Sequence, residues 1–156
     1  MQFEKVGVAS DHAGKELRKM VLEYLQASGV QTVDYGVDFK HEKSVDYPDY
    51  SALLAEGVSK GEFDGAIAIC GTGLGMSISA NKFPGVRATC VWDEFSCRMS
   101  REHNNSNILC LGSRALNFHR AVELVRIWLE TSFLGDRHQL RLNKIHEIEK
   151  LNFKPR

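Results

Sequence analysis

The sequence predicts a single-domain α/β fold of the Rossmann-like, three-layer kind, in which a five-stranded parallel sheet carries helices on both faces. Short apolar segments alternate with amphipathic ones along the whole chain of 156 residues, an order typical of parallel strands joined by crossover helices. The segment Ala66–Cys70 is almost wholly apolar, as expected of a strand buried on both faces. No linker or internal repeat interrupts the pattern, so one domain is expected over residues 1–156.

Three strands and two helices are predicted in the first half of the chain. Val6–Ser10 is the first strand, and apolar residues then recur at helical spacing until Gly29 ends the helix. The second strand is predicted over Gln31–Val37. Pro48 lies in the first turn of the second helix, where proline is tolerated. Ala66–Cys70 is the third strand.

The second half continues the alternation after a glycine-rich turn. Its predicted elements are a helix near Met76 to Lys82, a strand at Val86–Trp92, a helix near Glu94 to Glu102, a strand at Asn107–Leu111, a long helix over about Phe118 to Phe133, and a terminal helix at about 136–151. Leu124 and Trp128 share one face of the long helix, which indicates that this face packs on the sheet.

Composition and charge exclude several classes of protein. Hydrophobic residues make up 43% and charged residues 26%, close to the globular average, which argues against disorder. Lys and Arg total 20, as do Asp and Glu, so no long-range attraction to nucleic acid or to an anionic membrane is expected. The sequence has neither a membrane-spanning apolar run nor a signal-peptide profile, and the expected location is the cytoplasm.

The four cysteines are expected to have different roles. They include no Cys-x-x-Cys pair, so neither a zinc site nor a redox motif is indicated, and no metal ion is expected. Cys90, Cys97 and Cys110 are expected to be structural, since a free cysteine usually packs as a small hydrophobic residue. Cys70 differs because a glycine-rich loop follows it directly.

Candidate functional residues collect at the ends of the predicted elements. In parallel sheets of this kind the ligand binds beyond the carboxyl ends of the strands. The polar residues expected at that edge are Asp11, His12, Cys70, His103, Asn104 and Arg114. Histidine can pass protons near neutral pH, although a lone histidine is more often an ordinary surface residue. Asp11 also fits the N-cap of the first helix.

Three glycines, Gly71, Gly73 and Gly75, open the helix that follows the third strand. Their N–H groups can converge on an anion, whereas tight packing of a strand on a helix accounts for one glycine rather than three. The spacing Gly-x-Gly-x-Gly differs from the dinucleotide fingerprint, and no Walker lysine follows. Asp93 still lies at a distance that fits a ribose-binding acid, so spacing alone leaves a nicotinamide site open.

Cys70 is predicted to end the third strand, beside these amides and a helix N-terminus. Such surroundings favour a thiolate, which acts as a nucleophile or as a base. A cysteine hydrolase that uses His103 and Asn104 is one interpretation. A packing role for a buried thiol is another.

Arg137 and Arg141 lie four residues apart, on one face of the terminal helix. Alone they fit a solvated surface. Together with Arg114 they can form a phosphate clamp, because guanidinium groups match phosphate oxygens bidentately. An anion cradle, a candidate thiolate, histidines and arginines suit a small phosphorylated substrate that undergoes proton transfer.

Seven motifs, in order over nearly the whole chain, resemble the type B ribose-5-phosphate isomerases of the ribose/galactose isomerase family. They are Ser10–Gly14, Asp46–Pro48, Ile69–Gly75, Ala80–Lys82, Ser100–Asn104, Gly112–Arg114 and Gly135–Gln139. The resemblance implies a cofactor-independent aldose–ketose isomerase of the pentose phosphate pathway. Its substrates would be D-ribose 5-phosphate and D-ribulose 5-phosphate.

The resemblance also implies a role for each matching residue. Cys70 would be the base that moves a proton between C1 and C2, and His103 would open the sugar ring. Thr72 and the loop amides would stabilise the enediolate oxygen. The substrate-binding residues implied are Asp11 and Asn104 for the sugar, Gly71, Gly73, Leu74 and Gly75 for the enediolate, and His12, Arg114, Arg137 and Arg141 for the phosphate.

Assembly follows from the same resemblance. It implies a homodimer or a dimer of dimers with shared active sites, in which His103 and the C-terminal helix (about 136–151) act across the interface. Some relatives lack the cysteine and carry a glutamate at the Gly75 position, so Cys70 with Gly75 indicates the cysteine-base branch. The nearest alternative is an isomerase of allose 6-phosphate or galactose 6-phosphate. A sugar-phosphate or nucleotide-binding module without catalysis is the alternative from another class.

Overall fold

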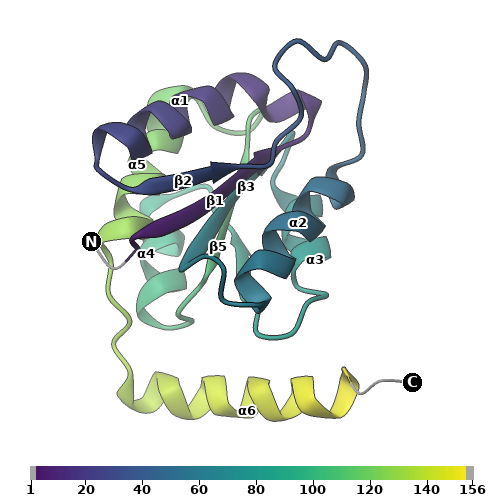
Figure 1. Ribbon diagram of the computed structural model, residues 1–156. Helices are drawn as coiled ribbons and strands as arrows, with labels where there is room; N and C mark the ends of the chain where they lie inside the picture. Colours follow the sequence, from purple (N-terminus) through teal and green to yellow (C-terminus); the bar gives the residue numbers. More distant parts are fainter. Residues whose placement is uncertain (1–2, 154–156) are drawn as a thin grey trace.

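The computed structural model describes residues 3–153 and confirms the predicted fold class. Five parallel strands form one sheet in the order β2-β1-β3-β5-β4 (Figure 1). The strands are β1 (Lys5–Ser10), β2 (Gln31–Asp34), β3 (Gly65–Cys70), β4 (Ala88–Cys90) and β5 (Ile108–Gly112). The helices are α1 (Lys15–Ala27), α2 (Tyr47–Ser59), α3 (Leu74–Ala80), α4 (Glu94–Glu102), α5 (Phe118–Glu130) and α6 (Asp136–Asn152), with a short 3-10 helix at His12–Gly14.

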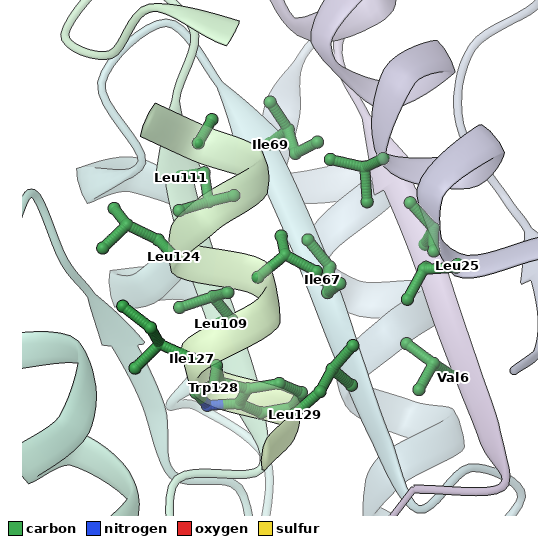
Figure 2. Packing of buried hydrophobic residues seen from close by; sticks show 14 of the residues in the cluster. Val6, Leu25, Ile67, Ile69, Leu109, Leu111, Leu124, Ile127, Trp128 and Leu129 are labelled. Atoms are coloured by element: carbon green, nitrogen blue, oxygen red, sulfur yellow. The ribbon is translucent and has the colours of Figure 1, made fainter. Parts of the chain in front are cut away.

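Helices cover both faces of the sheet because its central strands are apolar on both sides. Successive residues of a strand point to opposite faces. Ile67 and Ile69 of β3 therefore pack with Trp128 in the core under α1 and α5 (Figure 2). Ala66 and Ala68 of the same strand belong to the second core, under α2 and α3. The chain thus forms three layers, as the alternating pattern of the sequence predicts.

The two edge strands are shorter than the sequence predicts. β2 ends at Asp34 rather than at Val37, and β4 has three residues where the range 86–92 was expected. An edge strand pairs on one side alone, so fewer backbone hydrogen bonds hold it in the sheet. Tyr35 and Val37 still donate to carbonyl groups of β1, although the chain has left the regular ladder there.

Helix α6 lies apart from the other helices and crosses the amino edge of the sheet (Figure 1). His138 and Leu142 are its buried residues. The apolar residues that α6 exposes are Leu140, Ile145, Ile148 and Leu151. Grouped exposed apolar side chains are typical of surfaces that meet another protein. Although α6 is long, no helix within residues 3–153 combines the length and apolarity that crossing a membrane requires.

Candidate active site

A cleft of about 220 Å³ opens at the carboxyl edge of the sheet. It lies where the strand order reverses, between β1 and β3, which is where open parallel sheets bind their ligands. The loops after β1, β3 and β5 line it, together with the start of α2. The lining residues are Asp11, His12, Ala13, Tyr47, Cys70, Gly71, Thr72, Gly75 and Arg114.

Hydrogen bonds between neighbouring loops hold this cleft in shape. The Ser113 N–H donates to the Cys70 carbonyl at 2.9 Å, and the Arg114 N–H donates to the Gly71 carbonyl at 2.9 Å. The Ser113 hydroxyl donates to the Ala13 carbonyl at 2.8 Å. The Arg114 guanidinium lies against Gly71, where a Cβ would come within 3.2 Å of Nη1. The three loops therefore form one connected rim that carries a fixed positive charge.

The Cys70 thiol lines the cleft although its residue is 4% exposed. Its Sγ accepts a hydrogen bond of 3.1 Å from the Gly73 N–H. Such a bond stabilises negative charge on sulfur. Gly73 has a φ of +82°, and a Cβ there would lie 2.7 Å from Cys90 Sγ and 3.0 Å from the Leu111 carbonyl carbon. Both the backbone conformation and the lack of space require glycine.

Asp11 and His12 form the β1 side of the cleft. Asp11 Oδ1 accepts hydrogen bonds from the N–H groups of Ala13 and Gly14, at 2.9 and 3.2 Å. Asp11 is therefore an N-cap, as predicted, but it caps the short 3-10 helix and not α1, whose N-cap is Gly14. His12 Nδ1 lies 3.2 Å from both the backbone N and the backbone O of Val45. This contact joins the cleft to the loop that precedes α2.

His103 and Asn104 lie elsewhere, and their expected position at the carboxyl edge is wrong. They follow α4, which runs back from the carboxyl end of β4 toward the amino edge. Arg87, just before β4, donates from Nε to the Asn104 carbonyl at 3.1 Å, which places both residues at that opposite edge. The expectation fails because a helix that follows a parallel strand ends where the next strand begins.

His103 belongs instead to a cluster of basic side chains at the start of α6. Its imidazole stacks on that of His138, with ring centroids 4.0 Å apart and planes 10° from parallel. Arg141 Nη1 lies 3.3 Å from His138 Nδ1, and Arg137 lines a surface hollow with His138. These four residues are the amino-edge cluster. Within one chain the expected clamp of Arg137 and Arg141 with Arg114 therefore does not form.

His138 is expected to make the stability of the fold depend on pH. Burial, followed by the charges of His103, Arg137 and Arg141, lowers the pKa of His138 from its ordinary value of 6.5. Unfolding restores that ordinary value, so the unfolded chain binds this proton more readily than the folded chain. The stability that neutral His138 contributes is full above pH 6.5 and is lost as pH falls through its folded-state pKa.

Thermal melting of His138→Asn above and below pH 6.5 checks this. We expect the variant to lose less melting temperature on acidification than the wild type loses. His146→Asn is the matched control, since it removes an exposed imidazole from the same helix. An unchanged loss in His138→Asn would contradict the assignment.

Two residues, one in the cleft and one in the amino-edge cluster, have no role predicted from the sequence. Tyr47 lines the cleft and packs on Gly75, where a Cβ would lie 2.5 Å from the ring carbon Cζ. Its place at the start of the helix after β2 was a usable signal, since such a position lies at the carboxyl edge. His138 stands beside Arg137 in the sequence, but no pattern indicates that its ring stacks on His103.

The remaining thiols are not exposed nucleophiles. Burial raises the pKa of Cys97 to about 12. Burial, and next the nearby Cys70, raises the pKa of Cys90 to about 11, and burial raises that of Cys110 well above its ordinary value. All three are therefore protonated near neutral pH. Within residues 3–153, no group of three or more His, Cys, Asp or Glu side chains is arranged to hold a metal ion.

The chain is similar to known isomerases over most of its length. The family model described as Ribose/Galactose Isomerase matches residues 6–145. Ribose-5-phosphate isomerase B of Escherichia coli is 40% identical over 147 residues, which cover 94% of this chain and 97% of that protein. The structure of ribose-5-phosphate isomerase B from Clostridium thermocellum matches with a TM-score of 0.91 and 46% identity, over 94% of this chain and 98% of that one. The Mycoplasma genitalium enzyme, solved with bound ribulose 5-phosphate, matches with a TM-score of 0.90 and 39% identity, over 94% and 96%.

Proposed function

The chain belongs to the ribose/galactose isomerase family, and from this we propose that it interconverts D-ribose 5-phosphate and D-ribulose 5-phosphate through an enediolate. The general chemistry, an aldose–ketose isomerisation of a sugar phosphate, follows from the family. The pentose is the further step. It is supported by the E. coli relative and by the ribulose 5-phosphate bound in the Mycoplasma genitalium structure.

The observation that carries the proposal is the position of the Cys70 thiol, which lines the cleft while its sulfur accepts the Gly73 N–H. Isomerisation needs a base near C1 and C2, together with donors for the oxygen that becomes negatively charged. We assign the base to Cys70. Thr72 and the amides of residues 71–75 are the donors for the enediolate oxygen, and Asp11 binds sugar hydroxyls.

The reaction moves protons and no hydride. Cys70 takes the proton from C2 of the open-chain aldose and returns it to C1 of the enediolate. Over the same cycle a proton leaves the C2 hydroxyl and one is added at the C1 oxygen, so the substrate and product are isomers. Because no electron pair is passed to an acceptor, the cycle requires no redox cofactor.

The amino-edge cluster can act in this reaction through a second copy of the chain. His103 and Cys70 lie at opposite edges of one subunit, so they share a site only if two copies pack with these edges together. We propose a homodimer, or a dimer of dimers, in which His103 and Asn104 open the sugar ring and orient the substrate bound by the other copy. The exposed apolar side chains of α6 support such an interface.

The phosphate end of the substrate would be held from both copies. His12 and Arg114 line the cleft, and Arg137 and Arg141 approach it from the second copy. Guanidinium groups bind phosphate bidentately, so this arrangement restores the clamp that one chain cannot form. The C-terminal helix then contributes to both the active site and the subunit contact.

Mixing two inactive variants tests whether the site is shared. We expect Cys70→Ala and His103→Ala to be nearly inactive alone, but to recover activity after unfolding and refolding together. In each mixed dimer one site then carries both native groups, so random pairing restores roughly a quarter of the wild-type rate. The rate is measured by following ribulose 5-phosphate formation.

A second mixture is the matched control for that recovery. Cys70 and Arg114 line the same cleft of one chain, so Cys70→Ala mixed with Arg114→Ala should recover nothing. Recovery in this control, or none in the Cys70 and His103 mixture, would contradict a site assembled from the two edges.

A 6-phosphosugar remains the alternative substrate. Its phosphate lies one carbon further from the reacting carbons. The same base could act on it, but the groups that bind the phosphate would have to lie further from Cys70. The ratio of kcat/KM for ribose 5-phosphate, allose 6-phosphate and galactose 6-phosphate decides between them. The proposal expects the pentose to have the highest value.

A further inference from the structure

We propose that Cys90 is a positioning residue, whose thiol holds the peptide group between Thr72 and Gly73 so that its N–H points at Cys70 Sγ. The proposal builds on the assignment of Cys70 as the base. Its main test is the reactivity of the Cys70 thiol, which can be measured without any isomerase assay.

One peptide group connects the two sulfur atoms. Cys90, the last residue of β4, donates from Sγ to the Thr72 carbonyl at 3.5 Å. The N–H on the other side of that same peptide bond belongs to Gly73 and donates to Cys70 Sγ at 3.1 Å. Because the peptide group is planar and trans, its C=O and N–H point in opposite directions. Holding the oxygen therefore aims the N–H.

Packing allows this peptide little freedom to turn. Cys90 Sγ and the Leu111 backbone both pack close to the Gly73 α-carbon, since a Cβ there would lie 2.7 Å from the sulfur and 3.0 Å from the Leu111 carbonyl carbon. Its φ of +82° is a conformation that few residues adopt. Loss of the Cys90 thiol would open space beside Gly73 and free the Thr72 carbonyl at once.

The hydrogen bond from Cys90 also strengthens the bond between the Gly73 N–H and Cys70 Sγ, in addition to the effect of packing. A hydrogen bond to a carbonyl polarises the peptide group and strengthens the bond that its N–H donates. Cys90 can serve as this donor because burial raises the pKa of its thiol to about 11, so it keeps its proton near neutral pH. Cys90 thus donates to the carbonyl side of this peptide group, and Cys70 Sγ accepts from its N–H side.

The test compares three variants by the rate at which iodoacetamide alkylates Cys70 at neutral pH, resolved by peptide mass spectrometry. Cys90→Ala removes the donor and its volume. Cys90→Ser keeps a donor on a side chain of similar shape. Cys97→Ala is the matched control, because the Cys97 thiol, like that of Cys90, donates to a backbone carbonyl, here that of Leu124. Cys97 is buried in the other core, whereas Cys90 is half-buried.

We expect Cys90→Ala to alkylate at Cys70 roughly threefold more slowly than the wild type. A hydrogen bond to a charged group is worth about a factor of ten, and a thiolate that loses it becomes more nucleophilic, which recovers part of the rate. The variant should also show a kcat reduced several-fold with KM unchanged. Cys90→Ser should restore most of both quantities, and Cys97→Ala should change neither.

If iodoacetamide alkylates Cys70 in Cys90→Ala at the same rate as in the wild type, the proposal is overturned. An equal slowing in Cys97→Ala would overturn it as well, since the effect would then come from general loosening of the fold. Slow alkylation in Cys90→Ala, together with absent isomerase turnover in the wild type, would uphold the positioning role and refute the proposed function. The two claims can therefore fail separately.

Discussion

Replacing Cys70 with alanine is expected to abolish isomerase turnover while leaving the affinity for ribose 5-phosphate nearly intact. Removal of a general base costs about 10²- to 10⁴-fold in rate. The groups assigned to the phosphate, such as Arg114, bind through side chains that the substitution does not touch. Turnover is followed by ribulose 5-phosphate formation, and affinity by isothermal titration calorimetry.

Cys97→Ala controls for the loss of a buried thiol, since Cys97 is fully buried and lies outside the cleft. It should lower stability and keep turnover. Either of two results would contradict the assignment of Cys70 as the base. One is turnover in Cys70→Ala close to the wild-type rate, and the other is a loss of affinity as large as the loss of turnover.

Replacing Gly73 with alanine is expected to have the second largest effect. The left-handed conformation costs a non-glycine residue about 1–2 kcal/mol, and the new Cβ would also collide with Cys90 Sγ and the Leu111 backbone. The loop must shift, which moves the N–H that donates to Cys70. Turnover should fall by about 10²-fold, the loss that a misplaced catalytic group of this kind produces.

Gly61→Ala is the control that separates the cost of the left-handed backbone from the collision of the new Cβ. Gly61 has a φ of +73°, close to that of Gly73, but a Cβ there would have no heavy atom within 4 Å. It therefore imposes the backbone cost alone, and should reduce the melting temperature without reducing kcat. Equal kcat in Gly73→Ala and the wild type would show that the amide of Gly73 is not part of the catalytic machinery.

The fold was predictable because its strongest signals are local. The apolar run that became β3 can be buried on both faces only at the centre of a sheet, and helical spacing fixed α1 and α5. β4 shows where local signals end. Its predicted range of 86–92 contracts to three residues because that strand pairs on one side, with β5.

The candidate site was half predictable. Residues that follow strands, such as Asp11, Cys70 and Arg114, meet in one cleft because parallel strands end at one edge. His103 follows a helix, so the same rule applied to it gives the wrong edge. The stack of His103 on His138 depends on how α6 runs along the amino edge of the sheet, and no periodicity in the sequence encodes that path.

The measurement that tests the central claim most directly is the conversion of ribose 5-phosphate to ribulose 5-phosphate by the purified protein, with and without EDTA. If the protein is a sugar-phosphate isomerase with Cys70 as its base, we expect turnover of ribose 5-phosphate that EDTA does not reduce. Absence of turnover with ribose 5-phosphate and with the 6-phosphosugars, despite saturable binding, would contradict it and leave a protein that only binds sugar phosphates.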